Sequence, residues 1–423
     1  MKASLRLDHE LLAVEGEHTV HAMLELVAPA VEKDAERPPL RLALVIDRSA
    51  SMSGPKLEHT KAAAAQLIQR LAPRDEVALV AYDDEVRLLA PMAPVDRDLL
   101  QREIAAITPG GSTNLSGGWL KGAEEVARSA GDGPRKVLLL TDGQANQGVI
   151  DVPSLVEIAG NLRRAGVGTT TIGYGADFNE NLLTQMAEAG GGNAHFAASP
   201  EDAPGIFARE FTDLARVVAQ NLSVEIRPTE DVKLVGVLNE YPSTAVVGGV
   251  QLTLGDVYSE ENRRVVFELH IPEMAKLGVC NVADVVIRYV TLGDEVAAHE
   301  ITLPLVINMV SAAEAEGATA DAEVVEEVLI LKAARAQREA RERADHGDFD
   351  GAQKLLRESA GRLRDLASGS ARAEELLQEA ELLERHAETT APAMWDASSA
   401  KAMHYNAHRM RQARRRFKHD YGN

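Results

Sequence analysis

Cysteine is almost absent from this sequence of 423 residues, which contains one, Cys280. A single cysteine excludes an internal disulfide framework and is typical of a reducing compartment. The N-terminal segment MKASLRLDHELLAVEGE also lacks the continuous apolar centre of a secretory signal, because Asp8, His9 and Glu10 interrupt it. We therefore expect a cytoplasmic protein.

Aromatic residues, long apolar runs and positive charge are also scarce. Aromatics form 4% of the chain although hydrophobic residues form 45%, which indicates a soluble globular protein rich in Ala, Val and Leu. No stretch approaches the roughly 20 unbroken apolar residues of a membrane helix, so we expect no membrane association. The formal net charge of −20 argues against nucleic-acid binding, because a phosphate backbone needs a basic surface. The basic segment 409–419 is most simply a solvated helix end.

The length predicts two or three domains, and the composition and hydrophobic periodicity of the sequence change three times along the chain. Residues 4–28 alternate apolar and polar side chains around a turn at 15–17, which predicts a strand pair. The charged segment 32–39 ends in two prolines and is typical of a linker. We therefore separate the N-terminal strands, residues 1–36, and expect them to pair with a later β region.

Between residues 40 and 221, apolar strands alternate with amphipathic helices. We expect strands at 42–47, 77–82, 136–141, 168–174 and 194–197, and helices near 57–72, 97–107, 116–129, 153–165, 179–189 and 203–219. The strands are continuously apolar, as they are when helices cover both faces of a sheet. This pattern predicts a doubly wound α/β domain with a mainly parallel, Rossmann-like sheet. Ligands of such domains gather at the carboxyl ends of the strands.

Two further regions follow. In residues 222–310 the helical period disappears, and hairpin turns are expected at Gly248-Gly249 and at 292–294, which predicts an antiparallel β-sandwich. The α/β domain is then either inserted in the β region or followed by it, and we favour insertion. Residues 311–423 are rich in Ala, Glu, Arg and Leu at helical spacing, with breaks at Gly347, Gly369 and Pro392. They predict a C-terminal helical hairpin or small bundle.

Hydroxyl and carboxyl groups are concentrated where the first predicted strand of the α/β domain ends. Asp47, Ser49 and Ser51 occupy alternate positions, so in an extended turn their side chains point the same way. Thr113 follows a glycine pair and opens a helix, and Asp142 ends a second apolar strand. All five lie at one edge if the sheet is parallel. Oxygen-only ligands suit a hard cation, Mg²⁺ first, with Mn²⁺ or Ca²⁺ as alternatives.

In this order the residues match DxSxS, Thr and TDG, and the chain resembles the von Willebrand factor A (VWA) family with its metal-ion-dependent adhesion site (MIDAS). The resemblance implies that Ser49, Ser51 and Thr113 supply direct hydroxyl ligands. It implies that Asp47 and Asp142 hold the metal mainly through bound water. Neutral ligands leave the charge of the cation largely unneutralised, so an acidic side chain of a partner can complete its coordination. Taken singly, each residue could instead cap a neighbouring loop.

The region after this domain carries a looser resemblance. Residues 254–272 are similar to the β region of bacterial relatives of the calcium-activated chloride channel and inter-alpha-trypsin inhibitor heavy-chain group. No function follows from this resemblance, because the sequence has no channel segment and no extracellular signature.

Several other residues are expected to be structural. Ala50 stands where many VWA domains have glycine and could strain the turn, and Arg48 is expected to face solvent, as is the loop 83–85. His404 and His408 lie one helical turn apart, but Tyr405 replaces the glutamate of the zinc-peptidase motif. We therefore expect both histidines on an exposed helix face. Trp119 and Trp395 are expected to be packing residues.

These features predict a binding protein and not an enzyme. We expect an intracellular scaffold whose MIDAS-bound Mg²⁺ captures Asp or Glu of a protein partner, with neither nucleic acid nor membrane as a partner. One alternative is a regulatory adaptor of an AAA+ ATPase or another enzyme, because VWA proteins often accompany such machines. A further alternative is a Mg²⁺-dependent hydrolase, which is disfavoured because His59 is the only imidazole near the motif in sequence and no general base is evident.

Overall fold

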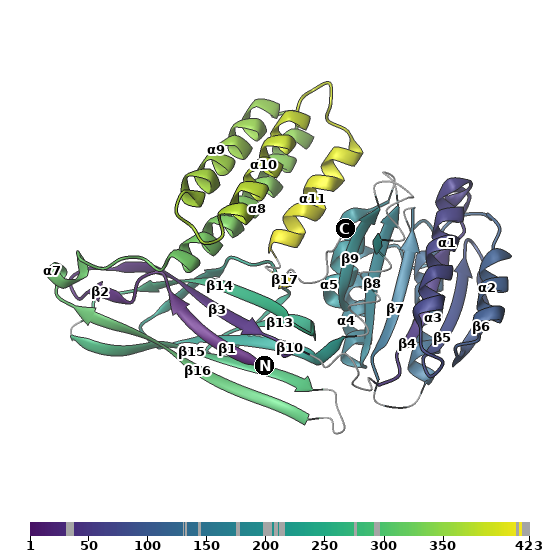
Figure 1. The fold of residues 1–423 in the computed structure, drawn as a ribbon, viewed down its shortest axis with the longest axis horizontal. Coiled ribbons are helices and arrows are strands. Elements are labelled where there is room, and N and C mark those ends of the chain that lie inside the picture. The colour runs from purple at the N-terminus through teal and green to yellow at the C-terminus, as the bar shows by residue number, and fades with distance from the viewer. Residues whose placement is uncertain are drawn as a thin grey trace.

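The computed structural model of the protein has three lobes: an α/β domain, a β domain and a helical region (Figure 1). The described residues are 1–30, 38–129, 131, 133–142, 145–174, 178–197, 205–206, 210, 216–274, 277–291, 297–411 and 414–416. Residues 32–37 of the predicted linker, the predicted turn at 292–294, most of the helix predicted at 203–219 and most of the basic segment beyond 411 lie outside them.

The α/β domain is built on a six-stranded sheet in the order β6-β5-β4-β7-β8-β9. All neighbouring strands are parallel except β6, which runs antiparallel to β5 at one edge. The strands are β4 (Arg41–Asp47), β5 (Glu76–Tyr82), β6 (Val86–Pro94), β7 (Arg135–Thr141), β8 (Val167–Tyr174) and β9 (Gly191–Ala197). The predicted α/β class with a mainly parallel sheet is confirmed. β6 has no counterpart among the expected strands because it contains Pro91 and Pro94, which are tolerated only at a sheet edge.

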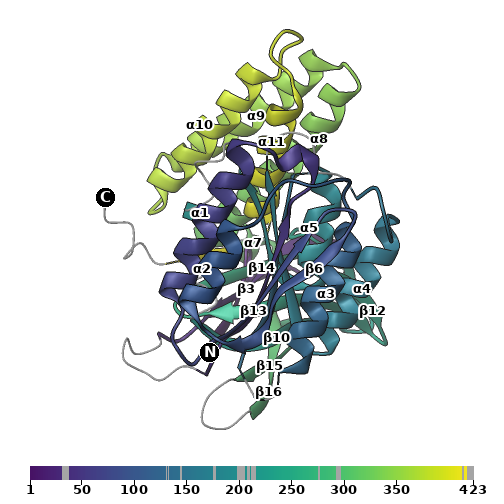
Figure 2. The same ribbon diagram turned by 90° about the vertical axis from the view of Figure 1, so that its right-hand side faces the viewer.

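Helices cover both faces of this sheet, as Figure 2 shows. They are α1 (Pro55–Arg70) and α2 (Arg97–Ala105) on one face, and α3 (Leu115–Arg128), α4 (Val152–Arg164) and α5 (Glu180–Ala189) on the other. Side chains of β4 alternate between the two cores: Leu44 packs with α1 and α2, and Val45 packs with α3. Because both faces are buried, the strand is apolar along almost its whole length. Trp119 is fully buried in the second core, as expected.

Two sheets form the β domain, and their strands are antiparallel except where β2 pairs with β16. One has the order β1-β3-β14-β11 with β17 added on β14, and the other has the order β12-β13-β10-β15-β16-β2. The strands are β1 (Lys2–Leu7), β2 (Leu11–Ala13), β3 (His18–Val27), β10 (Val217–Pro228), β11 (Lys233–Val237), β12 (Ser243–Val246), β13 (Gly249–Tyr258), β14 (Glu261–Ile271), β15 (Gly278–Thr291), β16 (Ala297–Val310) and β17 (Arg414–Arg416). Leu24 and Phe267 of the first sheet share one core with Ile226 and Ile287 of the second, which makes the domain a sandwich.

The α/β domain is an insertion in this sandwich. β3 pairs with β14 along its full length, and the chain leaves the sandwich after β3 and returns at β10. The N-terminal segment differs from the expected strand pair, because β2 crosses to the other sheet and pairs in parallel with β16. The two lobes also meet through a buried ion pair: the Nζ of Lys136 lies 2.7 Å from a carboxylate oxygen of Asp256. Lys136 stands near the first residue of β7, at the edge of the sheet opposite the predicted metal ligands.

The C-terminal region is helical. It contains α7 (Ala312–Ala315), α8 (Ala322–Asp345), α9 (Phe349–Ala367), α10 (Ala373–Thr389) and α11 (Ala397–Arg411). Alanines alternate with larger residues in the core of the bundle: Ala334, Ala352, Ala360 and Ala380 are fully buried, as are Leu356 and Leu376. Among the described helices, none is long and apolar enough to cross a membrane.

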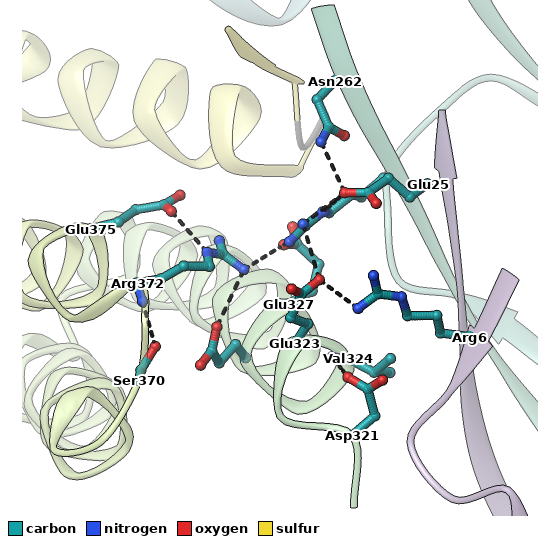
Figure 3. A network of polar contacts seen from close by, with 12 residues as sticks. Arg6, Glu25, Asn262, Asp321, Glu323, Val324, Glu327, Ser370, Arg372 and Glu375 are labelled. Atoms are coloured by element: carbon teal, nitrogen blue, oxygen red, sulfur yellow. Dashed lines mark hydrogen bonds and ion pairs between the residues drawn. The ribbon is translucent and has the colours of Figure 1, made fainter. Parts of the chain in front are cut away.

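Charged side chains join the helical region to the sandwich (Figure 3). Arg264 of β14 lies 2.7 Å from Glu25 of β3 and 3.2 Å from Glu327 of α8. Arg372, just before α10, lies 3.1 Å from the same Glu327, whose side chain is fully buried. One buried carboxylate between two guanidinium groups therefore fixes α8 and α10 on the sandwich.

Helix α11 joins the helical region to the α/β domain. The Nζ of Lys401 donates hydrogen bonds of 2.5 Å to the carbonyl oxygen of Phe178 and to the carboxylate of Glu180, the first residue of α5. Arg341 of α8 pairs with the other oxygen of Glu180. Tyr405 stacks on Phe196 of β9 with ring centroids 5.6 Å apart. The helical region and the α/β domain therefore meet at this junction.

The prediction that His404 and His408 lie on an exposed helix face is wrong, because α11 packs against α5. His408 is buried and its Nδ1 lies 3.1 Å from the carboxylate of Glu188. The Nε2 of His404 lies 3.1 Å from the hydroxyl of Thr184, and Arg341 donates to its Nδ1 over 2.9 Å. Since a guanidinium only donates, Nδ1 is the unprotonated nitrogen of a neutral imidazole.

Replacing Glu180 should destabilise the protein. A Glu180→Gln change leaves the cations of Lys401 and Arg341 poorly compensated at a site where all three side chains are at most 16% exposed. We expect the free energy of unfolding to fall by about 3 kcal/mol, measured by urea unfolding followed by tryptophan fluorescence. The matched control is Glu124→Gln, an exposed ion-pair residue whose loss should cost less than about 1 kcal/mol. Equal effects of the two changes would contradict this role of α11.

Acid should also destabilise the junction. Burial lowers the pKa of His404 from 6.5 to about 4, and the charge of Arg341 acts in the same direction. The unfolded chain therefore takes up this proton first, and stability is lost as the pH falls from about 6.5 to about 4. In His404→Gln the slope of unfolding free energy against pH in this window should be shallower by up to about 1.4 kcal/mol per pH unit. Chemical unfolding at a series of pH values measures it, and an unchanged slope would contradict the prediction.

Candidate metal centre

The five predicted metal ligands all lie at the carboxyl edge of the α/β sheet. Asp47 is the last residue of β4, and Ser49 and Ser51 lie in the turn that leads to α1. Thr113 stands two residues before α3, and Asp142 directly follows β7. They gather there because β4 and β7 are adjacent and parallel, so both strands end at the same edge.

Four of the five side chains form a connected set. The main-chain N–H of Ser49 donates to Oδ1 of Asp47 over 2.8 Å. The hydroxyl oxygens of Ser49 and Ser51 lie 3.1 Å apart, and the Ser51 hydroxyl donates to Oδ1 of Asp142 over 2.7 Å. The hydroxyl of Thr141 holds the other oxygen of Asp47 over 2.6 Å. Hydrogen bonds therefore link the end of β4, the turn after it and the end of β7.

Thr113 joins the set through its main chain. Its N–H donates to the side-chain oxygen of Asn146 over 2.9 Å, and its carbonyl oxygen accepts the N–H of Asn146 over 3.2 Å. Asn146 follows Asp142 in the chain, so it ties the Thr113 loop to the loop that carries Asp142. The N–H of Ala50 also donates to the carbonyl of Gly111 over 2.9 Å. All three loops of the site are thus hydrogen-bonded to one another.

Arg48 does not face solvent as predicted; it is buried together with Asp83. Its guanidinium lies 2.6 Å from the Asp83 carboxylate, and the two side chains are 8% and 3% exposed. The same carboxylate accepts the N–H of Gly111 over 3.0 Å. Gly110 is glycine because a Cβ there would lie 1.7 Å from Oδ2 of Asp83. The expectation of a solvated loop is therefore wrong at Asp83, which braces the Thr113 loop against the turn after β4.

Ala50 does not strain the turn. It lies in a short 3-10 helix, Ala50–Met52, and among the residues that the structure describes the non-glycine positions with positive φ are Asn221 and Glu260. A methyl group is tolerated there because the backbone does not need the left-handed conformation.

The electrostatics of the site call for a cation. Asp47 and Asp142 are both fully buried, and burial raises the pKa of Asp47 to about 6, with the charge of Asp142 acting in the same direction. A positive group reaches Asp142: the Nζ of Lys56 lies 2.5 Å from its Oδ2. Ser51 is exposed, so the site opens to solvent on that side. Buried carboxylates with hydroxyl oxygens beside them are the donor set of a hard cation.

Comparison with known proteins identifies the domain that carries this edge. Residues 42–209 match the family model of the von Willebrand factor type A domain. The chain contains a VWA domain. VWA domains commonly bind a metal ion at the MIDAS and commonly mediate protein interactions. The sequence-based resemblance to this family is confirmed.

Relatives extend the likeness beyond the VWA domain. An uncharacterized protein of Synechocystis sp. is 27% identical over 376 residues, which cover 84% of this chain and 87% of the relative. Inter-alpha-trypsin inhibitor heavy chain H1 of Mesocricetus auratus is 28% identical over 172 residues, which cover 38% of this chain and only 19% of that protein. The structure titled von Willebrand factor type A from Catenulispora acidiphila superposes with a TM-score of 0.73 at 17% identity and covers 96% of both chains. The fold of all three lobes is therefore shared.

Several residues that shape the site were not predicted. They are Lys56 on Asp142, Thr141 on Asp47, Asn146 on the Thr113 loop, and the Arg48–Asp83 pair. Thr141 carries a sequence signal, since it directly precedes Asp142 at the end of a buried strand. The other partners could not be predicted from the sequence, because each contact joins residues that lie far apart in the chain.

Loss of the Asp83 charge should loosen the Thr113 loop without removing a predicted ligand. Asp83→Asn keeps the size of the side chain but leaves Arg48 buried and unpaired, which costs about 3 kcal/mol of VWA domain stability. We expect faster hydrogen exchange at the amides of residues 48–51 and 110–114, measured by mass spectrometry. The control is Asp84→Asn, a change at the exposed neighbouring carboxylate. Equal rates of hydrogen exchange at these amides in Asp83→Asn and Asp84→Asn would contradict the bracing role of Asp83.

Proposed function

We propose that the VWA domain binds Mg²⁺ and uses it to capture an Asp or Glu side chain of a protein partner. Ser49, Ser51 and Thr113 would be the direct ligands, and Asp47 and Asp142 would hold the ion through bound water. Mn²⁺ or Ca²⁺ could replace Mg²⁺, since both accept oxygen ligands. The observation that carries the proposal is a pair of buried carboxylates, linked through Ser49 and Ser51, at a site that opens to solvent at Ser51.

The ligand set explains why the captured group would be a carboxylate. Three neutral hydroxyls in direct contact leave most of the charge of the ion uncompensated. Asp47 cannot move to neutralise it, because Ser49 and Thr141 hold both of its oxygens. Ser51 and Ser53 are exposed, so a partner side chain can reach the ion from solvent. An anionic oxygen from outside then completes the coordination.

We propose binding and not catalysis for this site. Within the described part of the chain, the five residues form hydrogen bonds with hydroxyl, carboxylate, amide, main-chain and ammonium groups. None of these groups is an imidazole poised to accept a proton from water, which a metal-dependent hydrolase would use. The sandwich and the helical region would present the VWA domain as parts of a scaffold.

Metal binding by defined variants tests the first half of the proposal. Mn²⁺ serves as the probe because its free form is quantified by electron paramagnetic resonance. We expect Ser49→Ala and Asp142→Asn to weaken Mn²⁺ binding by at least about tenfold, which corresponds to about 1.4 kcal/mol. The matched control is Ser53→Ala, which removes a hydroxyl from the same exposed turn and should leave the affinity unchanged. Equal affinity in Ser49→Ala and Ser53→Ala would contradict the assigned ligands.

Peptide selection tests the second half. A displayed random-peptide library is selected on the full chain in Mg²⁺ and counter-selected in chelator. Recovered peptides should share an Asp or Glu whose replacement by Asn or Gln abolishes binding. Peptides that bind equally well in chelator, or that tolerate loss of every carboxylate, would exclude capture through the metal. Metal-dependent release of phosphate from p-nitrophenyl phosphate, lost in Asp47→Asn, would instead support hydrolysis.

A further inference from the structure

Lys56 is a positive group built into the proposed metal site. It is the second residue of α1, directly after the turn at Gly54, whose φ of +81° suits glycine. Its Nζ lies 2.5 Å from Oδ2 of Asp142, while the Ser51 hydroxyl occupies Oδ1 of the same carboxylate. One turn further along the helix, the hydroxyl of Thr60 donates to the carbonyl oxygen of Lys56 over 2.8 Å.

The two side chains of this ion pair differ in their exposure to solvent. The carboxylate of Asp142 is fully buried, whereas the side chain of Lys56 is 27% exposed. The carboxylate is therefore fixed, and the ammonium has a path to solvent along a flexible four-carbon stem. Lys56 can leave Asp142 without disturbing β7, but Asp142 cannot follow it.

The charges of the site explain what Lys56 changes. The carboxylates of Asp47 and Asp142 carry two negative charges, and Lys56 reduces their sum to minus one. A divalent cation would then make the site positive by one charge, and the carboxylate of a partner would bring it to neutrality. Without Lys56, the divalent cation alone would neutralise the two aspartates, and a further carboxylate would be in excess. Such differences matter most at a poorly solvated site.

We propose that Lys56 is a tethered counter-ion of Asp142 that weakens the binding of the metal alone and couples it to the binding of an acidic ligand. The divalent cation competes with the ammonium for Asp142 and is held firmly only when a carboxylate arrives. Metal and acidic ligand thus bind with positive cooperativity, and the coupling is reciprocal. This inference rests on the proposed metal-dependent capture and adds to it the residue that sets its cooperativity.

The test compares charge with hydrogen bonding at this position. Lys56→Gln keeps a donor for Asp142 without the charge, and Lys56→Arg keeps the charge. Lys61→Gln is the matched control, because Lys61 lies on the same helix and its Nζ contacts Glu58 and Ile107, outside the site. Mn²⁺ binding to each full-length variant is measured by electron paramagnetic resonance with and without acetate, the simplest carboxylate. Circular dichroism and a Mn²⁺-dependent rise in melting temperature show that each variant is folded.

We expect Lys56→Gln to bind Mn²⁺ alone at least about tenfold more tightly than the natural protein, about 1.4 kcal/mol. Acetate should raise the Mn²⁺ affinity of the natural protein severalfold and that of Lys56→Gln by a clearly smaller factor. Lys56→Arg and Lys61→Gln should behave like the natural protein.

The outcomes separate this inference from the proposed function. Mn²⁺ binding that is equal or weaker in Lys56→Gln overturns the role of Lys56 and leaves metal binding standing. Tighter binding with an unchanged effect of acetate overturns the cooperativity. Tighter binding in Lys56→Arg as well shows that packing is responsible, which also overturns the inference. Absence of Mn²⁺ binding in both the natural protein and Lys56→Gln overturns the proposed function together with it.

Discussion

The pairing of β3 with β14 is the constraint on which the architecture depends. It places a strand from the start of the chain beside one that follows the whole VWA domain, with continuous register from His18 opposite Ile271 to Val27 opposite Asn262. The α/β domain must therefore leave and re-enter the sandwich on the same side. The ion pair between Lys136 and Asp256 lies at that junction, so the opposite edge of the sheet, with the predicted metal ligands, points away from the sandwich.

At the free edge, charge is the dominant constraint. Desolvation of Asp47 opposes its ionisation and raises its pKa to about 6. Hydroxyl groups donate to both aspartates, and the ammonium of Lys56 pairs with Asp142. This arrangement fixes the carboxylates but leaves the positive charge movable. A second charge pair, Arg48 with Asp83, is buried a few residues away and holds the loops in place. The Arg48–Asp83 pair therefore supports the loops, whereas the Lys56–Asp142 pair lies among the proposed metal ligands.

Much of the α/β domain was predictable because its signals are local. Buried parallel strands are apolar throughout, and their polar ends must meet at one edge, which is how Asp47 and Asp142 could be brought together from sequence alone. The role of the five residues as ligands stays a prediction. Lys56 was missed because nothing local tells a lysine of a first helical turn from a solvated one. The direction of the Lys56 side chain depends on Asp142, which follows another strand, β7.

The remaining misses share this cause. Arg48 and Asp83 follow different strands, and their burial depends on how the Thr113 loop folds over them. His404 and His408 have the spacing of an exposed helix face, yet α11 meets α5 from a distant part of the chain and buries them. The edge strand β6 was not predicted, because prolines are unusual within strands. Sequence patterns predict elements and their ends, whereas the contacts between distant elements decide which side chains become buried.

The insertion of the VWA domain has a mechanical consequence. A domain inserted between β3 and β10 is connected to the sandwich by the polypeptide chain at two points, whereas a terminal domain is connected at one. A pulling force applied by a partner at the metal edge would be divided between them. The contacts of α11 with Phe178, Glu180 and Phe196 are a further link to the VWA domain, and this link is non-covalent. Non-covalent contacts break under tension before covalent bonds do, so the two chain connections would keep the VWA domain tethered to the sandwich after the contacts of α11 are lost.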